Sequence, residues 1–355
     1  MAAGESQKWV SRGPRPVGPA NLKDVALRAG VSTATASRVF SSPDLVRQQT
    51  RDRVLTAADE LGYVVNGLAR MMMGQGRRTV AILVAHMVGP TFASLAGAVE
   101  RVSAAEGHLF LLSTTQDDPV RERELIDTLR EQRAAAVLLV GSAPMDDAYI
   151  ERVQGYARDL ATIGARLVLC GRPAIPGHPD LLTVNYEQSR GIGEAVEHLV
   201  ALGHQRIAYI GQAADYTTPE QRLEGYKSAL VKAGLAVDDR LIQESDNVEE
   251  AGTRAAQELL DRCPDTTAIV CMTDNIAVGV YRATRARGLT IPDDLSVIGF
   301  DDTPLVGDLT PGLTTVRAPF EAVGRMAAEL ALGLPHSNEP LITELVVRGS
   351  TAAPR

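Results

Sequence analysis

Short apolar runs alternate with amphipathic stretches along most of this chain, from about residue 79 onward. A run of about four to eight apolar residues is typical of a strand buried on both faces, and apolar residues three and four apart are typical of a helix. The predicted strands are Val80–Ala85, Leu109–Ser113, Ala136–Val140, Leu167–Cys170, Ile207–Ile210, Ala268–Cys271 and Ser296–Gly299. The predicted helices are Phe92–Ala105, Glu122–Arg133, Glu194–Ala201, Gln221–Ala233, Thr253–Asp261 and Asn275–Arg287. This alternation predicts parallel sheets whose right-handed crossovers cover both faces.

The number of these units predicts the architecture. About a dozen such strands and helices, seven of them strands, are more than one open sheet usually carries, so we expect two similar α/β lobes with a cleft between them. Ligands of such sheets bind at the carboxyl ends of the strands. We therefore predict that residues 79–355 form a domain that binds a small molecule between two lobes.

The N-terminal part of the chain has a different pattern. Residues 1–20 are rich in Gly and Pro with little apolar periodicity, which predicts a disordered arm. Residues 21–65 fit an all-α headpiece with helices at Leu22–Ala29, Thr33–Phe40 and about Gln48–Leu61. Asn21 and Ser32 are expected to cap the first two helices, and Gly30 to end the first. Residues 66–78 are then a linker to the lobes.

The first two helices have the spacing of a helix-turn-helix. Their apolar residues can share one core: Val25, Ala26, Ala29, Ala36, Val39 and Phe40. This packing turns Thr33, Ala34, Ser37 and Arg38 outward near the start of the second helix, where such motifs contact base edges. Arg38 can bond bidentately to guanine, and Thr33 and Ala34 can contact a thymine methyl group.

Phosphate contacts are predicted from hydroxyls and from charge. The hydroxyls of Thr35, Ser37 and Thr50 suit phosphate oxygens. The net charge of the chain is −8, but residues 1–78 hold 12 Lys and Arg against 6 Asp and Glu, and the rest holds 24 against 38. The basic excess therefore lies where a phosphate-binding module needs it. From these residues alone, a three-helix protein-interaction domain remains an alternative.

The headpiece also resembles the lactose-repressor (LacI/GalR) family. The matching residues are Lys23-Asp24-Val25-Ala26, Ala29-Gly30-Val31-Ser32, Thr35, Ser37-Arg38-Val39, Thr50-Arg51, Val54, Leu61-Gly62-Tyr63, Asn66 and Ala69-Arg70. The resemblance implies a homodimer on a pseudo-palindromic operator, with DNA contacts from Leu22, Ser32, Asn66 and Ala69. It also implies a hinge helix after Asn66 in the minor groove, where Met72 replaces the usual Leu wedge.

The chain departs from the family's headpiece pattern at three positions. Ala36 replaces the usual Val, Val65 the usual Pro, and Arg47 the Ser that normally caps the third helix. We expect these changes to affect stability or phosphate contacts and to leave the reading face in place.

The rest of the chain resembles the family's effector-binding domain, with the two-lobed fold of type I periplasmic binding proteins. The matching segments include Gly203-His204, Arg206-Ile207, Thr273-Asp274 and Ile298-Gly299-Phe300-Asp301-Asp302. The resemblance implies a cleft that binds a sugar, nucleoside or sugar acid, lined by Phe92, Arg172, Arg222, Thr273, Asp301 and Phe320. We expect Asp274 and Asp302 to fix loops or cap helices as readily as to contact ligand, and Phe320 to be either core or lining.

The predicted cleft lacks several polar groups usual in the family. Thr273 replaces Asn, Gly171 replaces Asp, Glu187-Gln188 replaces Asp-Asn, and Ala318 replaces Gln. A degenerate, ligand-blind sensor domain therefore remains an alternative.

Other classes of protein have less support. No HExxH, GxSxG or Walker motif indicates an enzyme, and we expect no cofactor or metal. We expect Cys170, Cys263 and Cys271 to be buried thiols, and His198 and His204 to bond locally near a helix end. No apolar run spans a bilayer and the start lacks a signal sequence, so we expect a cytoplasmic protein that does not bind membranes. A solute-binding protein without DNA function would lack the basic headpiece.

Overall fold

The computed structural model describes residues 20–63, 78–87, 90–337 and 339–355. The chain divides into two compact units, Met1–Arg77 and Arg78–Arg355. The predicted arm at 1–20 and the predicted hinge helix and linker at 66–78 lie almost entirely outside the described residues. None of the described helices is long and apolar enough to cross a membrane.

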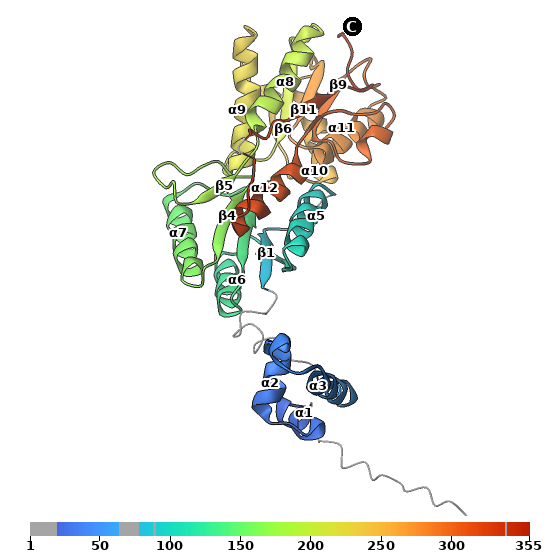
Figure 1. The fold of residues 1–355 in the computed structure, drawn as a ribbon. Helices are drawn as coiled ribbons and strands as arrows, with labels where there is room; N and C mark the ends of the chain where they lie inside the picture. Colours follow the sequence, from blue (N-terminus) through green and yellow to red (C-terminus); the bar gives the residue numbers. More distant parts are fainter. Residues whose placement is uncertain (1–19, 64–77, 88–89, 338) are drawn as a thin grey trace, which may run out of the picture. The chain divides into compact units, whose positions relative to one another are not determined.

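The headpiece is helical, and its helices begin where the sequence predicts. They are α1 (Leu22–Ala29), α2 (Thr33–Ser41), the short 3-10 helix η1 (Pro43–Leu45) and α3 (Gln48–Glu60) (Figure 1). Asn21 and Asp24 form a reciprocal capping box at the start of α1, and Gly30 ends it with φ 64°. Only a residue without a Cβ adopts that backbone conformation at low cost. Local capping chemistry therefore defines the ends of the first helix.

The headpiece core is small and tightly closed. Val25 of α1, Ala36 of α2 and Val54 of α3 are completely buried. Phe40 packs near the rim of this core against Tyr63, with ring centroids 5.8 Å apart. The apolar stripes predicted for the first two helices thus meet in one core, to which α3 adds a third side.

Helix α3 begins without a side-chain cap. Its N-cap residue is Arg47, which makes no capping hydrogen bond. We expect Arg47→Ser to stabilise the headpiece by about 1 kcal/mol, because a serine oxygen would accept from a free amide of the first turn. Hydrogen exchange of the Gln48–Glu60 amides should then slow by roughly fivefold. Gln49→Ser, inside the same helix, is the control, and equal effects of both substitutions would contradict the capping account.

The first lobe of the second unit is a parallel sheet in the order β2-β1-β3-β4-β5. Its strands are β1 (Thr79–Val84), β2 (Leu109–Thr114), β3 (Ala136–Val140), β4 (Arg166–Cys170) and β5 (Leu182–Val184). Its helices are α5 (Pro90–Ala105), α6 (Pro119–Glu131), α7 (Asp147–Ala161) and α12 (Phe320–Leu332). Alternate residues of β1 face opposite layers: Ile82 packs in the cluster with α5 and α12, whereas Leu83 packs in the cluster with α6 and α7.

The second lobe has the strand order β11-β10-β9-β8-β6-β7 and is parallel except for the pair β10 and β11. Its strands are β6 (Ile207–Gly211), β7 (Ile242–Glu244), β8 (Ala268–Cys271), β9 (Ser296–Asp301), β10 (Thr314–Arg317) and β11 (Glu344–Val346). Its helices are α8 (Gln188–Ala201), α9 (Thr217–Lys232), α10 (Glu249–Arg262) and α11 (Asp274–Ala286). These helices pack closely in pairs. Where α9 meets α8 there is no room for a side chain, since a Cβ on Gly225 would collide with the Ser189 backbone.

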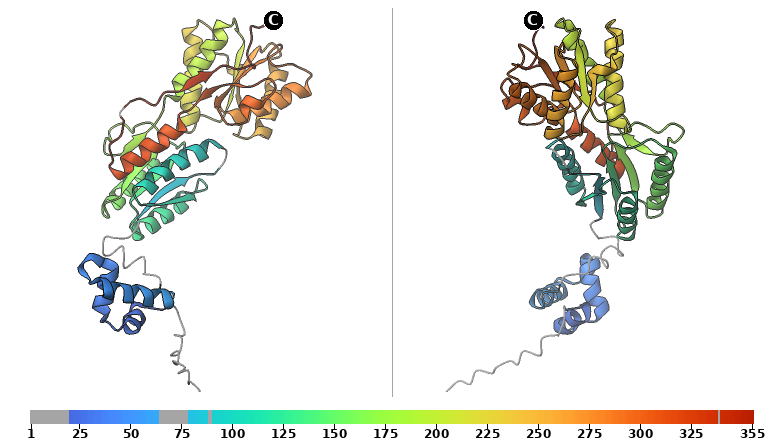
Figure 2. Two further views of the ribbon diagram at one scale, coloured as in Figure 1. Left: turned by 45° about the vertical axis from the view of Figure 1, so that its right-hand side comes forward. Right: turned by 180° about the vertical axis from the view of Figure 1, so that it is seen from behind.

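The chain passes between the lobes more than once. Helix α12 follows a strand of the second lobe but packs against α5 of the first, and the two helices lie side by side in Figure 2. The predicted two-lobed architecture is confirmed. The sequence prediction missed α7, α12 and the strands β5, β7, β10 and β11. The missed strands have only three or four residues each, and β5, β7 and β11 lie at the edges of their sheets.

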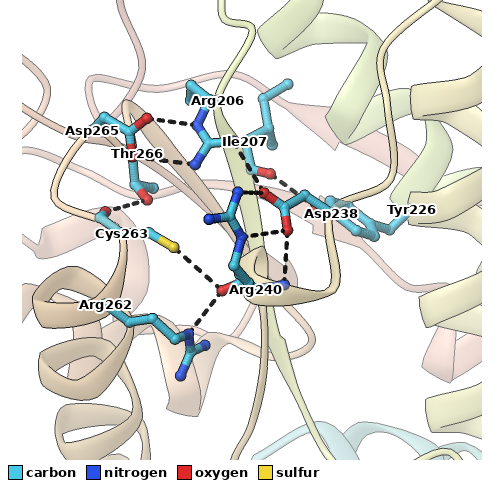
Figure 3. Close-up of polar contacts among 9 residues, drawn as sticks. All are labelled: Arg206, Ile207, Tyr226, Asp238, Arg240, Arg262, Cys263, Asp265 and Thr266. Atoms are coloured by element: carbon cyan, nitrogen blue, oxygen red, sulfur yellow. Dashed lines mark hydrogen bonds and ion pairs between the residues drawn. The ribbon is translucent and has the colours of Figure 1, made fainter.

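The Gly203-His204 and Arg206-Ile207 segment has a structural role at the amino end of β6. Arg206 forms ion pairs with Asp238 and Asp265, at 3.3 and 2.9 Å (Figure 3). Arg240 also bonds Asp238, and this bond holds the pKa of Asp238 well below its usual range. The cluster joins three chain segments at the end of the sheet opposite the carboxyl ends of its strands.

The two histidines of this region bond to distant segments, so the expectation of local bonds was wrong. His204 lies within 2.9 Å of Thr267 Oγ1 and 2.8 Å of the Ala352 carbonyl oxygen, and His198 lies 3.0 Å from Thr351 Oγ1. Both side chains therefore attach the C-terminal segment to the second lobe. The three cysteines are free and buried, as expected.

Candidate nucleic-acid interface and ligand cleft

The start of α2 presents the predicted reading face. Thr33, Ala34 and Arg38 are exposed, and Ser37 is half-buried. Ser32 Oγ accepts a hydrogen bond from Thr35 N at 3.1 Å and lies 2.9 Å from Thr35 Oγ1. The Ser32 hydroxyl therefore caps the helix and is bonded to the Thr35 hydroxyl, so any phosphate contact would have to share these two groups.

The basic side chains of the headpiece fall into two groups. Arg28 pairs with Glu60 at 2.6 Å, while Arg51 and Arg53 donate to the backbone carbonyls of Pro43 and Ala29. These three side chains are therefore engaged by protein groups. Within residues 20–63, the cations whose side chains have no protein partner are Lys23, Arg38 and Arg47. Sequence reasoning singled out Arg38 and missed Lys23 and Arg47 as candidate DNA contacts.

Of the other residues predicted to contact DNA, the structure describes Leu22 and Thr50. Leu22 is partly buried against the headpiece core, and Thr50 is half-buried in the first turn of α3. Asn66, Ala69 and Met72 lie outside the described residues.

A cavity of about 670 Å³ lies between the two lobes of the second unit. It is lined by residues at or just after the carboxyl ends of β1, β3, β6 and β7, where parallel sheets bind ligands. Phe92 and Ser142 line it from the first lobe, and Tyr216 and Asp246 from the second. Its size is that of a cleft for a small organic molecule.

The six predicted effector residues do not all line this cavity. Phe92 does. Asp301 and Phe320 line a second cavity of about 590 Å³, and Arg172 lines a third of about 110 Å³. Arg222 and Thr273 line none of these three cavities.

Arg222 is almost completely buried and bonded to the protein. Its side chain is 3% exposed and forms an ion pair with Asp301 at 3.2 Å. It also donates to Gln188 Oε1, to Tyr186 Oη and to the Met272 carbonyl oxygen. The guanidinium carbon lies 3.7 Å from the centroid of the Phe300 ring. In this state Arg222 joins several segments of the second lobe.

Arg172 is also engaged internally. It donates to the Gly141 carbonyl oxygen at 2.7 Å and to the Tyr149 hydroxyl, and its guanidinium lies 5.3 Å from the Tyr149 ring centroid. Both arginines expected at the ligand are therefore already bonded by protein groups.

Thr273, Asp274 and Asp302 organise loops. Thr273 caps α11 and donates to Asn247 Oδ1 at 2.6 Å. Asp274 accepts from Thr303 N and Thr315 Oγ1, at 2.7 and 2.6 Å. Asp302 forms ion pairs with Arg317 and Arg348. The loop-fixing role that the sequence left open for Asp274 and Asp302 is the one seen here.

Asp274 should make stability depend on pH. Burial raises its pKa to about 7, and the charge of Asp301 adds to the rise. Between about pH 4 and 7 the folded chain keeps a proton that the unfolded chain loses, so this group lowers stability as pH rises. From pH 6 to pH 8 we expect it to lower the free energy of unfolding by roughly 1 kcal/mol.

The measurement compares urea unfolding of the wild type and Asp274→Asn at both pH values. The comparison is needed because burial lowers the pKa of His198 and His204, which gives a slope of opposite sign. In the variant, the free energy of unfolding should not show the decrease between pH 6 and pH 8 that is assigned to Asp274. Identical pH profiles for the two proteins would contradict the assignment.

Several polar residues of the large cavity were missed by sequence reasoning. They include His86, whose Nε2 lies 2.9 Å from Asp117 Oδ2, and the exposed Tyr216, Glu244, Asp246 and Arg254. His86, Asp117 and Asp246 follow strands by two or three residues. The rule that ligands bind at carboxyl strand ends, applied to the predicted strands, would have found His86 and Asp117, whereas Asp246 follows β7, which the sequence did not predict.

The fold and these two sites define a class of protein, a DNA-binding regulator with a helix-turn-helix headpiece and a two-lobed ligand-binding domain. Residues 21–66 match the family described as "Bacterial regulatory proteins, lacI family", and residues 196–351 match the "Periplasmic binding protein-like domain". The chain belongs to the lacI family of bacterial transcriptional regulators.

Similar proteins support this assignment over nearly the whole chain. The HTH-type transcriptional repressor CytR of Escherichia coli (strain K12) is 34% identical over 340 residues, covering 94% of this chain and 97% of CytR. MalR of Streptomyces coelicolor is 34% identical over 342 residues, covering 94% and 96%. The lac repressor dimer bound to operator and the anti-inducer ONPF has a TM-score of 0.81 at 25% identity, covering 95% and 100%. The CelR–cellobiose complex has a TM-score of 0.67 at 32% identity, covering 93% and 99%.

Proposed function

We propose that this chain is a repressor that binds a specific operator as a homodimer and responds to a sugar or related metabolite. The observation that carries the DNA-binding part is the exposed face of α2, where Arg38 has no protein partner among the described residues. Thr33 and Ala34 lie on the same face and supply small apolar contacts for bases. A DNA partner implies a cytoplasmic location.

The homodimer has a candidate surface in the first lobe. Strand β2 is an edge strand, and its Leu109 and Leu111 are 51% and 40% exposed. An exposed apolar edge strand favours pairing with another chain. The related lac repressor is a dimer on its operator, by the description of that structure. Sedimentation equilibrium should give the mass of a dimer, and a monomer at micromolar concentration would contradict this part of the proposal.

The ligand-binding part of the proposal rests on the 670 Å³ cavity. Phe92 supplies an aromatic face for a ring, and Asp215, Glu244 and Asp246 supply carboxylates that accept from sugar hydroxyls. The CelR structure contains cellobiose, which supports a carbohydrate here. The second candidate is a ligand-blind domain, favoured by the internal bonding of Arg172 and Arg222.

Thermal unfolding with a panel of sugars, nucleosides and sugar acids distinguishes the two candidates. A ligand present at 100 times its Kd adds about 2.7 kcal/mol of stability. We expect a clear rise in Tm with at least one compound, and loss of that rise in Phe92→Ala. Leu305→Ala, at an exposed apolar position outside the cavity, is the control. If no compound in the panel raises the Tm, the ligand-blind candidate is supported.

A further inference from the structure

The segments that connect the two lobes lie next to one another. The chain crosses at residues 185–187 between β5 and α8, at 318–319 between β10 and α12, and again between α12 and β11. The first and last of these crossovers are bonded directly, because Glu187 N donates to the Leu341 carbonyl oxygen at 3.1 Å. Any change in the angle between the lobes must pass through these segments.

Tyr186 occupies the first crossover and contacts both lobes. It is 7% exposed, and its ring packs edge-on against Phe320 of α12, with centroids 5.8 Å apart and planes at 73°. Its hydroxyl accepts a hydrogen bond from Arg222 Nη2 at 3.0 Å. Helix α12 belongs to the first lobe and Arg222 to the second, so this side chain bridges the lobes.

The other partners of Arg222 all belong to the second lobe. Gln188 begins α8, Met272 follows β8, and Asp301 ends β9. Among the described partners of Arg222, Tyr186 is therefore the one that lies in a crossover segment. Hydrogen bonds that involve a charged group are stronger than those between neutral groups. A ligand that drew Arg222 toward the cleft would have to break this bond.

We propose that Tyr186 is a positioning residue that fixes the angle between the lobes by bonding Arg222. This inference rests on the proposed function, a repressor that responds to a ligand bound between its two lobes. When the bond is present, the crossover is locked to the second lobe and the lobes hold one relative angle. When it is absent, the crossover rotates and a second angle becomes populated.

The test measures the distance between the lobes in the ligand-free, full-length protein. Spin labels are placed by Val120→Cys and Val248→Cys, on exposed valines at the starts of α6 and α10, one in each lobe. The native cysteines are buried, so we expect the label to react with the two introduced cysteines. An excess of unlabelled protein removes distances between chains, and double electron–electron resonance gives the distribution within one chain.

Tyr186→Phe keeps the ring against Phe320 and removes only the hydroxyl. We expect the wild type to show one narrow distance and the variant to show a second, with the ratio of the two shifted by roughly tenfold. Tyr226→Phe is the matched control, because it removes a buried hydroxyl that donates to the Ile207 carbonyl oxygen at 2.9 Å within the second lobe (Figure 3). Both variants should have a lower Tm than the wild type.

Only Tyr186→Phe should change the distance distribution. A purely structural role for the hydroxyl predicts that the two variants differ from the wild type in Tm alone, and that result would overturn the proposal. Because no ligand is used, an effector screen that fails counts against the proposed sensor function and leaves this measurement valid.

Discussion

Replacing Arg38 with alanine is expected to weaken the preference of this protein for its operator over random DNA. Arg38 is an exposed cation on the reading face of α2, free of protein partners among the described residues. A bidentate arginine contact to guanine contributes about 1–3 kcal/mol of discrimination, or roughly 5- to 150-fold in relative affinity. Affinity for random DNA should fall much less, because phosphate contacts dominate it.

Arg28→Ala is the matched control for this prediction. It removes the same charge from the same headpiece, but Arg28 pairs with Glu60 at 2.6 Å on the helices α1 and α3. Competition binding at fixed salt should show that the control keeps its operator preference. If Arg38→Ala keeps that preference too, Arg38 does not read bases.

Replacing Arg222 with alanine is expected to lower the free energy of unfolding of the ligand-binding domain by about 3–5 kcal/mol. The substitution leaves the largely buried Asp301 carboxylate without its ion pair and leaves Tyr186 and Gln188 without their donor. Burial already raises the pKa of Asp301 to about 6 against the opposing effect of Arg222. Part of the loss should therefore be recovered near pH 5, where Asp301 takes up a proton.

Arg190→Ala provides the comparison for a surface arginine. Arg190 pairs with Glu187 and Glu194 along α8, but its side chain is 53% exposed. Such pairs contribute about 0–1 kcal/mol. Urea unfolding of both variants measures the difference. A loss below about 1 kcal/mol for Arg222→Ala would mean that the buried network does not stabilise the domain.

The headpiece was predictable because its signals are local. Asn21, Gly30 and Ser32 set helix ends through contacts within a few residues, and the apolar stripes follow from helical spacing. The long buried strands were predictable for the same reason. Strands β5, β7 and β11 have three residues each and lie at sheet edges, so their short segments carry no periodic pattern.

The ligand cleft was less predictable, because its residues come from distant segments. Family resemblance indicated Arg172 and Arg222, but their bonding depends on Tyr149, Tyr186 and Asp301, which only the tertiary fold brings near. The roles proposed for these arginines toward a ligand stay predictions. Residues that do line the large cavity, such as Asp246 and Arg254, belong to no motif in the sequence.

We propose that this chain recognises a specific DNA sequence through α2. The most direct test is selection by the full-length protein from a random DNA library, followed by footprinting of the enriched sequences. We predict enrichment of one inverted repeat with a guanine in each half-site whose protection depends on Arg38. Recovery of unrelated sequences, or protection that is the same in Arg38→Ala, would contradict the claim.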